Sequence, residues 1–361
     1  MKSFLQYFNQ SKTLVLVFGL FFLLNTNHAQ TTVYSNDFGV AENPLATLNV
    51  GTPAISWTNV TTGAGIVRTN IFPTGSTNYA LQITNNAGAV GRTYTYGGLT
   101  TFNDPFQETL SSNSNYIIWT FNMRTNRNNT STGFNTSNGY GSAVILCADG
   151  SDFLTANGYA VSLTRGTDKN AVRLVKFTGG LTASTNVTTI IGPSAESSTS
   201  YTDYHSVKVI YNPATNTWKL FSRIDGTSIV DPQSGTLIQV GAETVDDTYA
   251  NTAMSYFGFL FNHQTTTNYN VCFDNFKVVA TPNLTTELRS ENRINQIVKP
   301  IAGGFSISAE NASVKVYDSM GRLVVNKQID GVLDYKTATK GLYILHITTP
   351  KGYDVVKQVV Q

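Results

Sequence analysis

The sequence contains little charge. Asp, Glu, Lys and Arg make up 13% of its 361 residues, about half the usual share of roughly 25%, and the formal net charge is +2. Nucleic-acid binding needs concentrated positive charge, so we predict no nucleic-acid partner. No apolar run after the N-terminus is long enough to cross a membrane, so we predict no transmembrane segment.

Cysteine is also scarce. Cys147 and Cys272 are the only two, and both lie in apolar, strand-like segments. Without Cys-x-x-Cys spacing, a cysteine-bound metal cluster is not expected. In an oxidising compartment the two residues are able to form a disulfide, but buried free cysteines are common too, so both states stay open.

The N-terminus has the pattern of an export signal. Lys2 and Lys12 precede an uncharged apolar run from Thr13 to Leu24, which is shorter than the ~20 residues that a transmembrane helix needs. The pattern predicts a signal peptide over residues 1–29, cleaved near Ala29. A buried N-terminal helix is the alternative. No cysteine lies at the cleavage site, which argues against a lipoprotein anchor.

Short strand patterns dominate residues 31–280. Segments such as "YIIWTFNMR", "GSAVILC", "HSVKVIY" and "YFGFLFN" are rich in aromatic and β-branched residues and are separated by Gly, Asn, Asp and Pro turns. No segment has a convincing 3.6-residue helical period. The pattern predicts an all-β fold, an antiparallel β-sandwich or jelly roll, with a hairpin turn at residues 211–218.

A second, smaller domain follows. Residues 281–296 lose aromatic side chains and gain charge, which is typical of a linker. Strand patterns return in residues 297–361, for example in "SVKVYD", "LYILHI" and "YDVVKQVV". We therefore predict two domains.

The small domain contains a recognisable set of motifs. They are a hairpin with Tyr317, Asp318, Gly321 and Arg322, a strand entry with Gly341 and Tyr343, and a late Lys357 among valines. In this order the motifs resemble the C-terminal sorting domain (type A) of proteins exported by the type IX secretion system. The resemblance implies a small immunoglobulin-like β-sandwich whose partner is the type IX secretion machinery. It also implies that the protein passes through the periplasm and is secreted or displayed at the outer-membrane surface.

The large domain is similar to concanavalin A-like and laminin-G-like jelly rolls in its strand rhythm from residue 116 to residue 278. Fold alone does not determine function. The Glu-x-Asp-x-x-Glu, Gly-x-Ser-x-Gly and His-Glu-x-x-His motifs of three hydrolase classes are absent, so we assign no catalytic residue. A non-catalytic, lectin-like domain that binds extracellular polysaccharide or glycan is the first hypothesis. A surface adhesin or structural protein that binds protein is the second, and a glycoside hydrolase is the third.

Strand alternation indicates candidate ligand contacts. Trp119, Phe121 and Met123 share one face of their strand and belong to the core, which turns Asn122 and Arg124 to the opposite face. The same argument places Ser162 and Thr164 opposite a second apolar row. A curved sheet lined by small polar side chains and a guanidinium is suited to bind hydroxyl groups. An ordinary solvated face is the alternative. The loop 125–141 is expected at the surface.

Three further residues form a candidate calcium site. Asp37 follows the first predicted strand, and Asp274 and Asn275 lie in the last. First and last strands often pair in jelly rolls, and similar carbohydrate-binding sandwiches hold a structural calcium there. Calcium binds six to eight oxygen atoms, of which these side chains would supply part. The alternative is that Asp274 only caps a turn.

Overall fold

The computed structural model describes residues 30–39, 42–47, 49–63, 65–85, 91–125, 141–163, 170–181, 184–195, 202–263, 270–282, 297–349 and 352–360. The predicted signal peptide and most of the predicted linker lie outside these residues. The chain divides into two compact units: the large unit comprises residues up to Asp231 and Gln239–Pro282, and the small unit comprises residues from Asn283 onward, with Pro232–Ile238 grouped with it. Among the described residues, no helix is long and apolar enough to cross a membrane.

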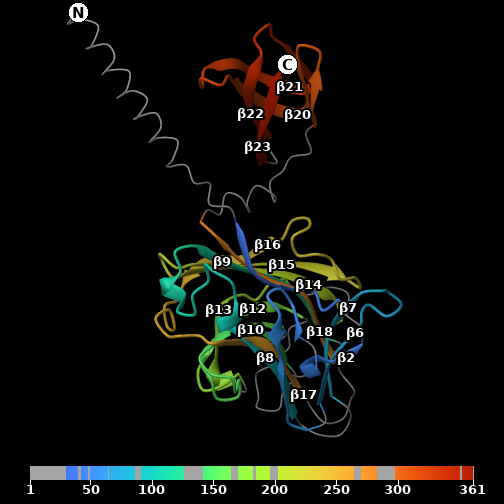
Figure 1. Cartoon of the computed structure of the whole chain (residues 1–361), viewed down its shortest axis with the longest axis vertical. Helices are drawn as coiled ribbons and strands as arrows, with labels where there is room; N and C mark the ends of the chain where they lie inside the picture. The colour runs from blue at the N-terminus through green and yellow to red at the C-terminus, as the bar shows by residue number, and fades with distance from the viewer. Residues whose placement is uncertain are drawn as a thin grey trace, which may run out of the picture. The chain divides into compact units, whose positions relative to one another are not determined.

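The large unit contains two antiparallel sheets (Figure 1). The nine-stranded sheet has the order β16 (Ile238–Val245), β15 (Thr217–Gly226), β14 (Tyr204–Asn212), β9 (Tyr116–Thr125), β18 (Asn270–Thr281), β7 (Tyr79–Asn85), β6 (Gly65–Ile71) and β2 (Asn43–Pro44), and β1 (Thr31–Asn36) also pairs with β18. The seven-stranded sheet has the order β13 (Val187–Ile191), β12 (Val172–Phe177), β11 (Gly158–Leu163), β10 (Gly141–Ala148), β17 (Tyr256–His263), β8 (Gly91–Gly98) and β5 (Thr58–Thr61).

Short elements complete this unit. Strands β3 (Asn49–Val50) and β4 (Ile55–Ser56) form a separate pair, and four 3₁₀ turns are η1 (Leu45–Thr47), η2 (Leu99–Thr101), η3 (Leu110–Ser112) and η4 (Ser184–Asn186). The described residues contain no α-helix. The predicted all-β, antiparallel fold is confirmed.

The core lies between the two sheets. Trp119, Phe121 and Met123 of β9 are fully buried in it, as their alternation predicts. Phe257 and Phe259 of β17 reach the same core from the seven-stranded sheet. Because alternate residues of a strand point to opposite faces, Thr120, Asn122 and Arg124 of β9 lie on the outer face of the nine-stranded sheet.

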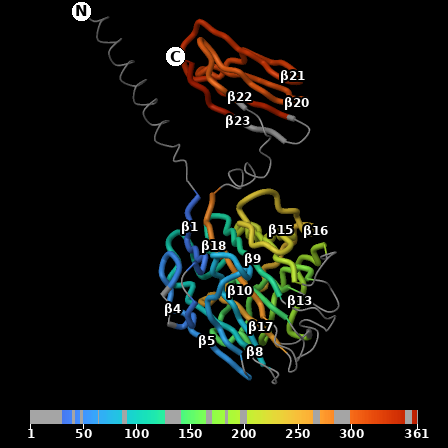
Figure 2. The backbone as a smooth tube through the Cα atoms, turned by 90° about the vertical axis from the view of Figure 1, so that its right-hand side faces the viewer, coloured from blue at the N-terminus to red at the C-terminus, as the bar shows by residue number. Residues whose placement is uncertain are grey.

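Two local predictions are also confirmed. Strands β14 and β15 form the expected hairpin, with Asn212 opposite Thr217. The first and last strands of the large unit pair, with Asn36 opposite Phe276, and run side by side in Figure 2 (blue and orange). The cysteines are far apart in the topology, on β10 and β18, and both are free and buried.

The small unit contains β19 (Ile297–Ile301), β20 (Gly304–Tyr317), β21 (Leu323–Lys336), β22 (Gly341–Thr349) and β23 (Gly352–Val360). Hydrogen bonds join all five strands into one antiparallel sheet. Strands β19 and β23 are at the two ends of the strand order β19-β20-β22-β23, and β21 pairs with β20. Because β19 and β23 contact each other, the sheet curls around one core. The predicted small β domain is therefore present, with its layers formed by one continuous sheet.

Candidate functional site

The outer face of the nine-stranded sheet contains a layer of buried polar side chains. Asn122 is 1% exposed and donates hydrogen bonds to Ser206 Oγ (3.1 Å) and the Val230 carbonyl (2.8 Å). Its Oδ1 accepts a hydrogen bond from Asn275 Nδ2 (2.7 Å). Asn122 therefore turns away from the core as predicted, but it is buried and its amide is bonded within the protein. The segment that contains Val230 is what covers it.

Arg124 lies one step further along β9 on the same face. Its Nε donates to the Thr202 carbonyl (2.8 Å), and its guanidinium lies 5.0 Å from the centre of the Tyr204 ring and 6.0 Å from that of Phe72. The side chain is half-buried. These contacts hold the guanidinium in place, and Arg124 borders an open pocket.

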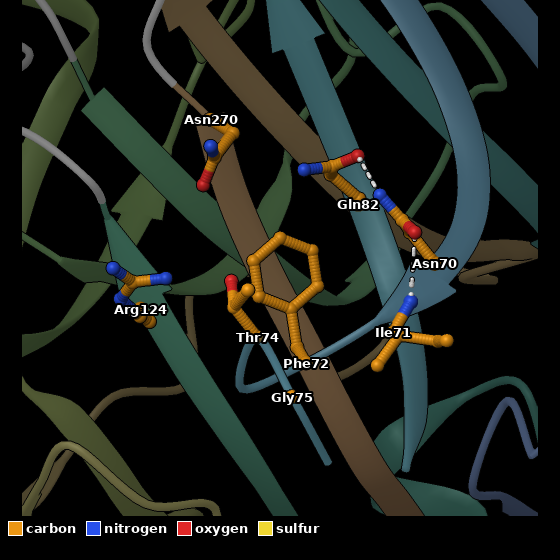
Figure 3. Close-up of a pocket in the computed structure, with 8 residues that line it drawn as sticks. All are labelled: Asn70, Ile71, Phe72, Thr74, Gly75, Gln82, Arg124 and Asn270. Atoms are coloured by element: carbon orange, nitrogen blue, oxygen red, sulfur yellow. Dashed lines mark hydrogen bonds between the residues drawn. The ribbon is translucent and has the colours of Figure 1, made fainter. Parts of the chain in front are cut away.

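The pocket has a volume of about 490 Å³, within the usual range of small-ligand sites. It is lined by Asn70, Ile71, Phe72, Thr74, Gly75, Gln82, Arg124 and Asn270 (Figure 3). These residues come from β6, the β6–β7 turn, β7, β9 and β18. In the figure, Arg124 and Gln82 lie on opposite sides, with the Phe72 ring between them.

Hydrogen bonds orient the amide of Gln82, which is 4% exposed. Its Oε1 accepts from Arg68 Nε (3.0 Å) and from Asn70 Nδ2 (3.1 Å). Asn70 is oriented in turn, because its Oδ1 accepts from the Ile71 backbone N–H (2.8 Å). With the Gln82 oxygen occupied twice, its NH₂ group is the part that remains for the pocket.

Asn270 adds an acceptor. Its Oδ1 is buried and has no hydrogen-bond partner, although the residue as a whole is half-buried at the start of β18. A buried oxygen without a partner is unfavourable, so a ligand donor at this position would be stabilised. Strand alternation would have indicated Gln82, which sits between core residues Leu81 and Ile83. No local sequence pattern indicates that the β6–β7 turn approaches β9.

The other two predicted ligand contacts are not at this pocket. Ser162 lies on β11 of the seven-stranded sheet and is fully buried. Its neighbours on the outward face, Ala160 and Ala143, belong to a second apolar cluster. Placing Ser162 on a ligand-facing surface was therefore wrong. Thr164 and most of the predicted surface loop 125–141 lie outside the described residues.

The proposed calcium ligands lie close to one another. Asp274 is 1% exposed and accepts hydrogen bonds from Asn78 Nδ2 (2.7 Å) and the Asn275 backbone N–H (2.7 Å). Burial, with a smaller contribution from the negative charge of Asp37, raises the pKa of Asp274 to about 7, although the two hydrogen bonds act in the opposite direction. The described residues contain no group of three or more His, Cys, Asp or Glu side chains around a metal position. A cation here would therefore rest on two carboxylates plus amide and backbone oxygens.

In the small unit, the Asp318–Arg322 turn joins β20 to β21. Asp318 Oδ1 accepts from the backbone N–H groups of Met320 and Arg322 (both 3.0 Å), and its Oδ2 accepts from Arg322 Nε (2.7 Å). These interactions, led by the Arg322 backbone hydrogen bond, lower the pKa of Asp318. Gly321 has φ +77°, which a residue with a Cβ resists. The predicted hairpin is confirmed.

The other predicted motif residues have distinct surroundings. The Tyr317 ring lies 5.1 Å from that of His346, edge to face. Tyr343 is buried and donates to the Thr339 carbonyl (2.9 Å), while Gly341 has φ +151°. Lys357 is exposed. The two tyrosines therefore stabilise the unit, whereas Lys357 is accessible to a partner.

The sequence of this unit matches a known family over residues 299–361, the family described as "Secretion system C-terminal sorting domain". The chain carries a sorting domain. The match confirms the resemblance to type IX sorting domains and indicates export to the cell surface or beyond. The family covers the tail alone, so it assigns no activity to the large unit.

Comparison with solved structures gives distant similarities. Basic winged bean lectin with Tn-antigen is 10% identical, with a TM-score of 0.40 over 70% of this chain and 99% of the lectin. Peanut lectin is 12% identical, with a TM-score of 0.36 over 70% and 98%. Alginate lyase vAL-1 from Chlorella virus is 8% identical, with a TM-score of 0.38 over 69% and 100%. At these values the similarities support no argument about ligand or activity. No curated protein matches the chain in sequence.

Proposed function

We propose that the large unit is a non-catalytic carbohydrate-binding domain, which the sorting domain delivers to the outside of the cell. The observation that carries this proposal is the pocket beside Arg124. It combines a fixed guanidinium, an oriented Gln82 amide, an unpartnered Asn270 oxygen and the Phe72 ring. Donors, acceptors and an aromatic face together suit the hydroxyl groups and C–H faces of a sugar.

The lining also favours binding over hydrolysis. Glycoside hydrolases of the usual kind need two carboxyl groups that flank the scissile bond. None of the described residues that line this pocket is acidic. A hydrolytic site would therefore have to lie elsewhere, and assays of product release from polysaccharides test that third hypothesis.

Glycan binding by the full chain is tested first on a glycan array and then by calorimetry. Asn270→Ala and Thr74→Ala should each weaken binding about 3- to 10-fold, as expected for one lost neutral hydrogen bond. Asn103→Ala and Thr188→Ala are matched controls, because both side chains are exposed and neither lines the pocket. Glycan affinity unchanged in Asn270→Ala and Thr74→Ala would place the ligand outside this pocket. Binding to immobilised proteins but to no glycan would favour the adhesin hypothesis.

Export is tested separately by deleting residues 297–361. The large unit has its own sheets and core, so it should still fold. Without the sorting domain we expect it to accumulate in the periplasm of a host with type IX secretion. Appearance of the truncated protein in the medium would show that the tail is not its export signal.

A further inference from the structure

The pocket contains one positive charge and no negative one. Arg124 is the sole charged residue among the described residues that line it, and the others are three amides, Thr74, Gly75, Phe72 and Ile71. None of the ion pairs found among the described residues includes Arg124. A partly enclosed cation of this kind favours an anionic group in the ligand.

Arg124 is held in place before any ligand binds. Its Nε is bonded to the Thr202 carbonyl, and its plane lies near the Tyr204 ring. A guanidinium has about five N–H donors, so donors remain for a ligand after the contacts with Thr202 and Tyr204, while the side chain has already lost much of its freedom. A guanidinium so placed matches the paired oxygens of a carboxylate or a sulfate.

The rest of the pocket suits the neutral part of a sugar. Across from Arg124, Gln82 offers its NH₂ group, because Arg68 and Asn70 already occupy its oxygen. Asn270 offers an unpartnered oxygen. One donor and one acceptor beside an aromatic ring are able to bind hydroxyl groups, and neither requires a charged ligand.

We infer that this pocket binds an acidic sugar, with its carboxylate or sulfate group against Arg124 and its hydroxyl groups against Gln82 and Asn270. The inference rests on the proposed carbohydrate-binding function and specifies the class of glycan. It predicts that binding is weakened both when the charge is removed from the sugar and when it is removed from Arg124.

The test uses charged and neutral forms of the same oligosaccharides with the purified full chain in 0.15 M NaCl. Oligomers of galacturonate, glucuronate and mannuronate are each compared with their methyl esters. Oligomers of sulfated galactan are compared with their desulfated forms. In at least one pair, the charged member should bind at least about 10-fold more tightly. The pair that shows this preference identifies the acid group.

Arg124→Gln should weaken binding of the charged member about 10- to 100-fold and change the neutral member by less than about 3-fold. Lys219→Gln is the matched control, because it removes one positive charge from β15 of the same sheet, outside the pocket. Arg124→Lys keeps the charge without the planar fork and should retain a weaker acid preference. Thermal melting of each variant checks that it is folded.

Three other results would count against the inference in different ways. If charged and neutral members bind equally, the ligand needs no acid group; if Arg124→Gln weakens both equally, Arg124 does not bind the acid group. Either result overturns the inference, whereas carbohydrate binding stands. If no glycan of either kind binds, the proposed function fails and the inference fails with it. An equal loss in Lys219→Gln would show that binding reflects overall charge and would also overturn the inference.

Discussion

The two sheets of the large unit have very different outer faces. The seven-stranded sheet carries a second hydrophobic cluster there, in which Phe153 and Leu181 cover Ala143, Ile145, Ala160, Val175 and Leu260. The nine-stranded sheet carries Asn122, Ser206 and Asp274 in a hydrogen-bonded polar layer beside the Arg124 pocket. Both faces point away from the main core, and the Arg124 pocket opens on the face of the nine-stranded sheet. Strand alternation therefore tells which side chains leave the core, whereas the covering segments determine which of them reach a ligand.

The largest expected difference between the two faces is in packing. Phe153 is fully buried, with its ring 5.2 Å from that of Tyr94, so Phe153→Ala should reduce the free energy of unfolding by ~3–5 kcal/mol. Phe72→Ala on the other face should cost less, because Phe72 borders an open pocket. Denaturant unfolding of both variants measures the difference. A larger loss in Phe72→Ala would mean that the pocket face is packed as tightly as the covered one.

The next effect concerns the buried carboxyl group in the polar layer. The pKa of Asp274 is about 7 in the folded state and ~3.9 in an unfolded chain. The folded state therefore binds the proton more tightly, and this group makes stability fall as the pH rises from about 4 to about 7, by up to ~4 kcal/mol. Asp274→Asn should remove this slope in chemical denaturation measured across that range. An unchanged slope would show that Asp274 is not the responsible group.

His205 is a useful counterpart on the core-facing side of the same sheet. It is fully buried, and burial lowers its pKa to about 4. For this group, stability falls as the pH decreases from about 6.5 to about 4, which is opposite in sign to the effect of Asp274. The two effects overlap in pH. The contribution of Asp274 is therefore measured as the difference in stability between Asp274→Asn and the unmodified protein at each pH.

Calcium binding would also act on the ionisation of Asp274. A cation bound by Asp37, Asp274 and Asn275 would favour the ionised form of Asp274. Millimolar calcium should then raise the melting temperature more at pH 8 than at pH 5, and Asp274→Asn should abolish the difference. Identical melting with calcium and with a chelator at pH 8 would eliminate the calcium hypothesis.

A smaller effect on stability is expected at the pocket itself. Arg124→Ala should lower glycan affinity by ~1–3 kcal/mol while reducing the free energy of unfolding by only ~1 kcal/mol, since one hydrogen bond and one ring contact are lost. Calorimetric titration and thermal unfolding of the same preparation separate the two quantities. A stability loss as large as that of Phe153→Ala would assign Arg124 to the structure rather than to the site.

No effect is expected from a reducing agent. Cys147 lies in the main core, and Cys272 lies on the outer face between Arg124 and Gln82 in register. Both thiols are free and buried. The melting temperature should therefore be the same with and without reductant. A shift of many degrees would reveal a disulfide and would require a different register for one of the two strands.

Local sequence patterns were sufficient for the parts of the fold that depend on neighbouring residues. Alternation placed Trp119, Phe121 and Met123 in the core, because successive side chains of any strand point to opposite faces. The Asp318–Arg322 turn was equally predictable, since its hydrogen bonds and its positive φ involve residues within the same five positions. The sorting domain was identified from such local motifs in their order along the chain.

The tertiary structure decided the site. Asn122 and Ser162 have the alternation of outward-facing residues, yet the first is bonded to the Val230 carbonyl and the second is fully buried opposite Ala143 of an apolar cluster. The pocket forms because the β6–β7 turn brings Phe72 to Arg124 on β9, which lies two positions from β7 and three from β6 in the sheet order and far along the chain. Contacts of this range depend on how loops pack over a finished sheet. No period or motif within a single strand contains that information.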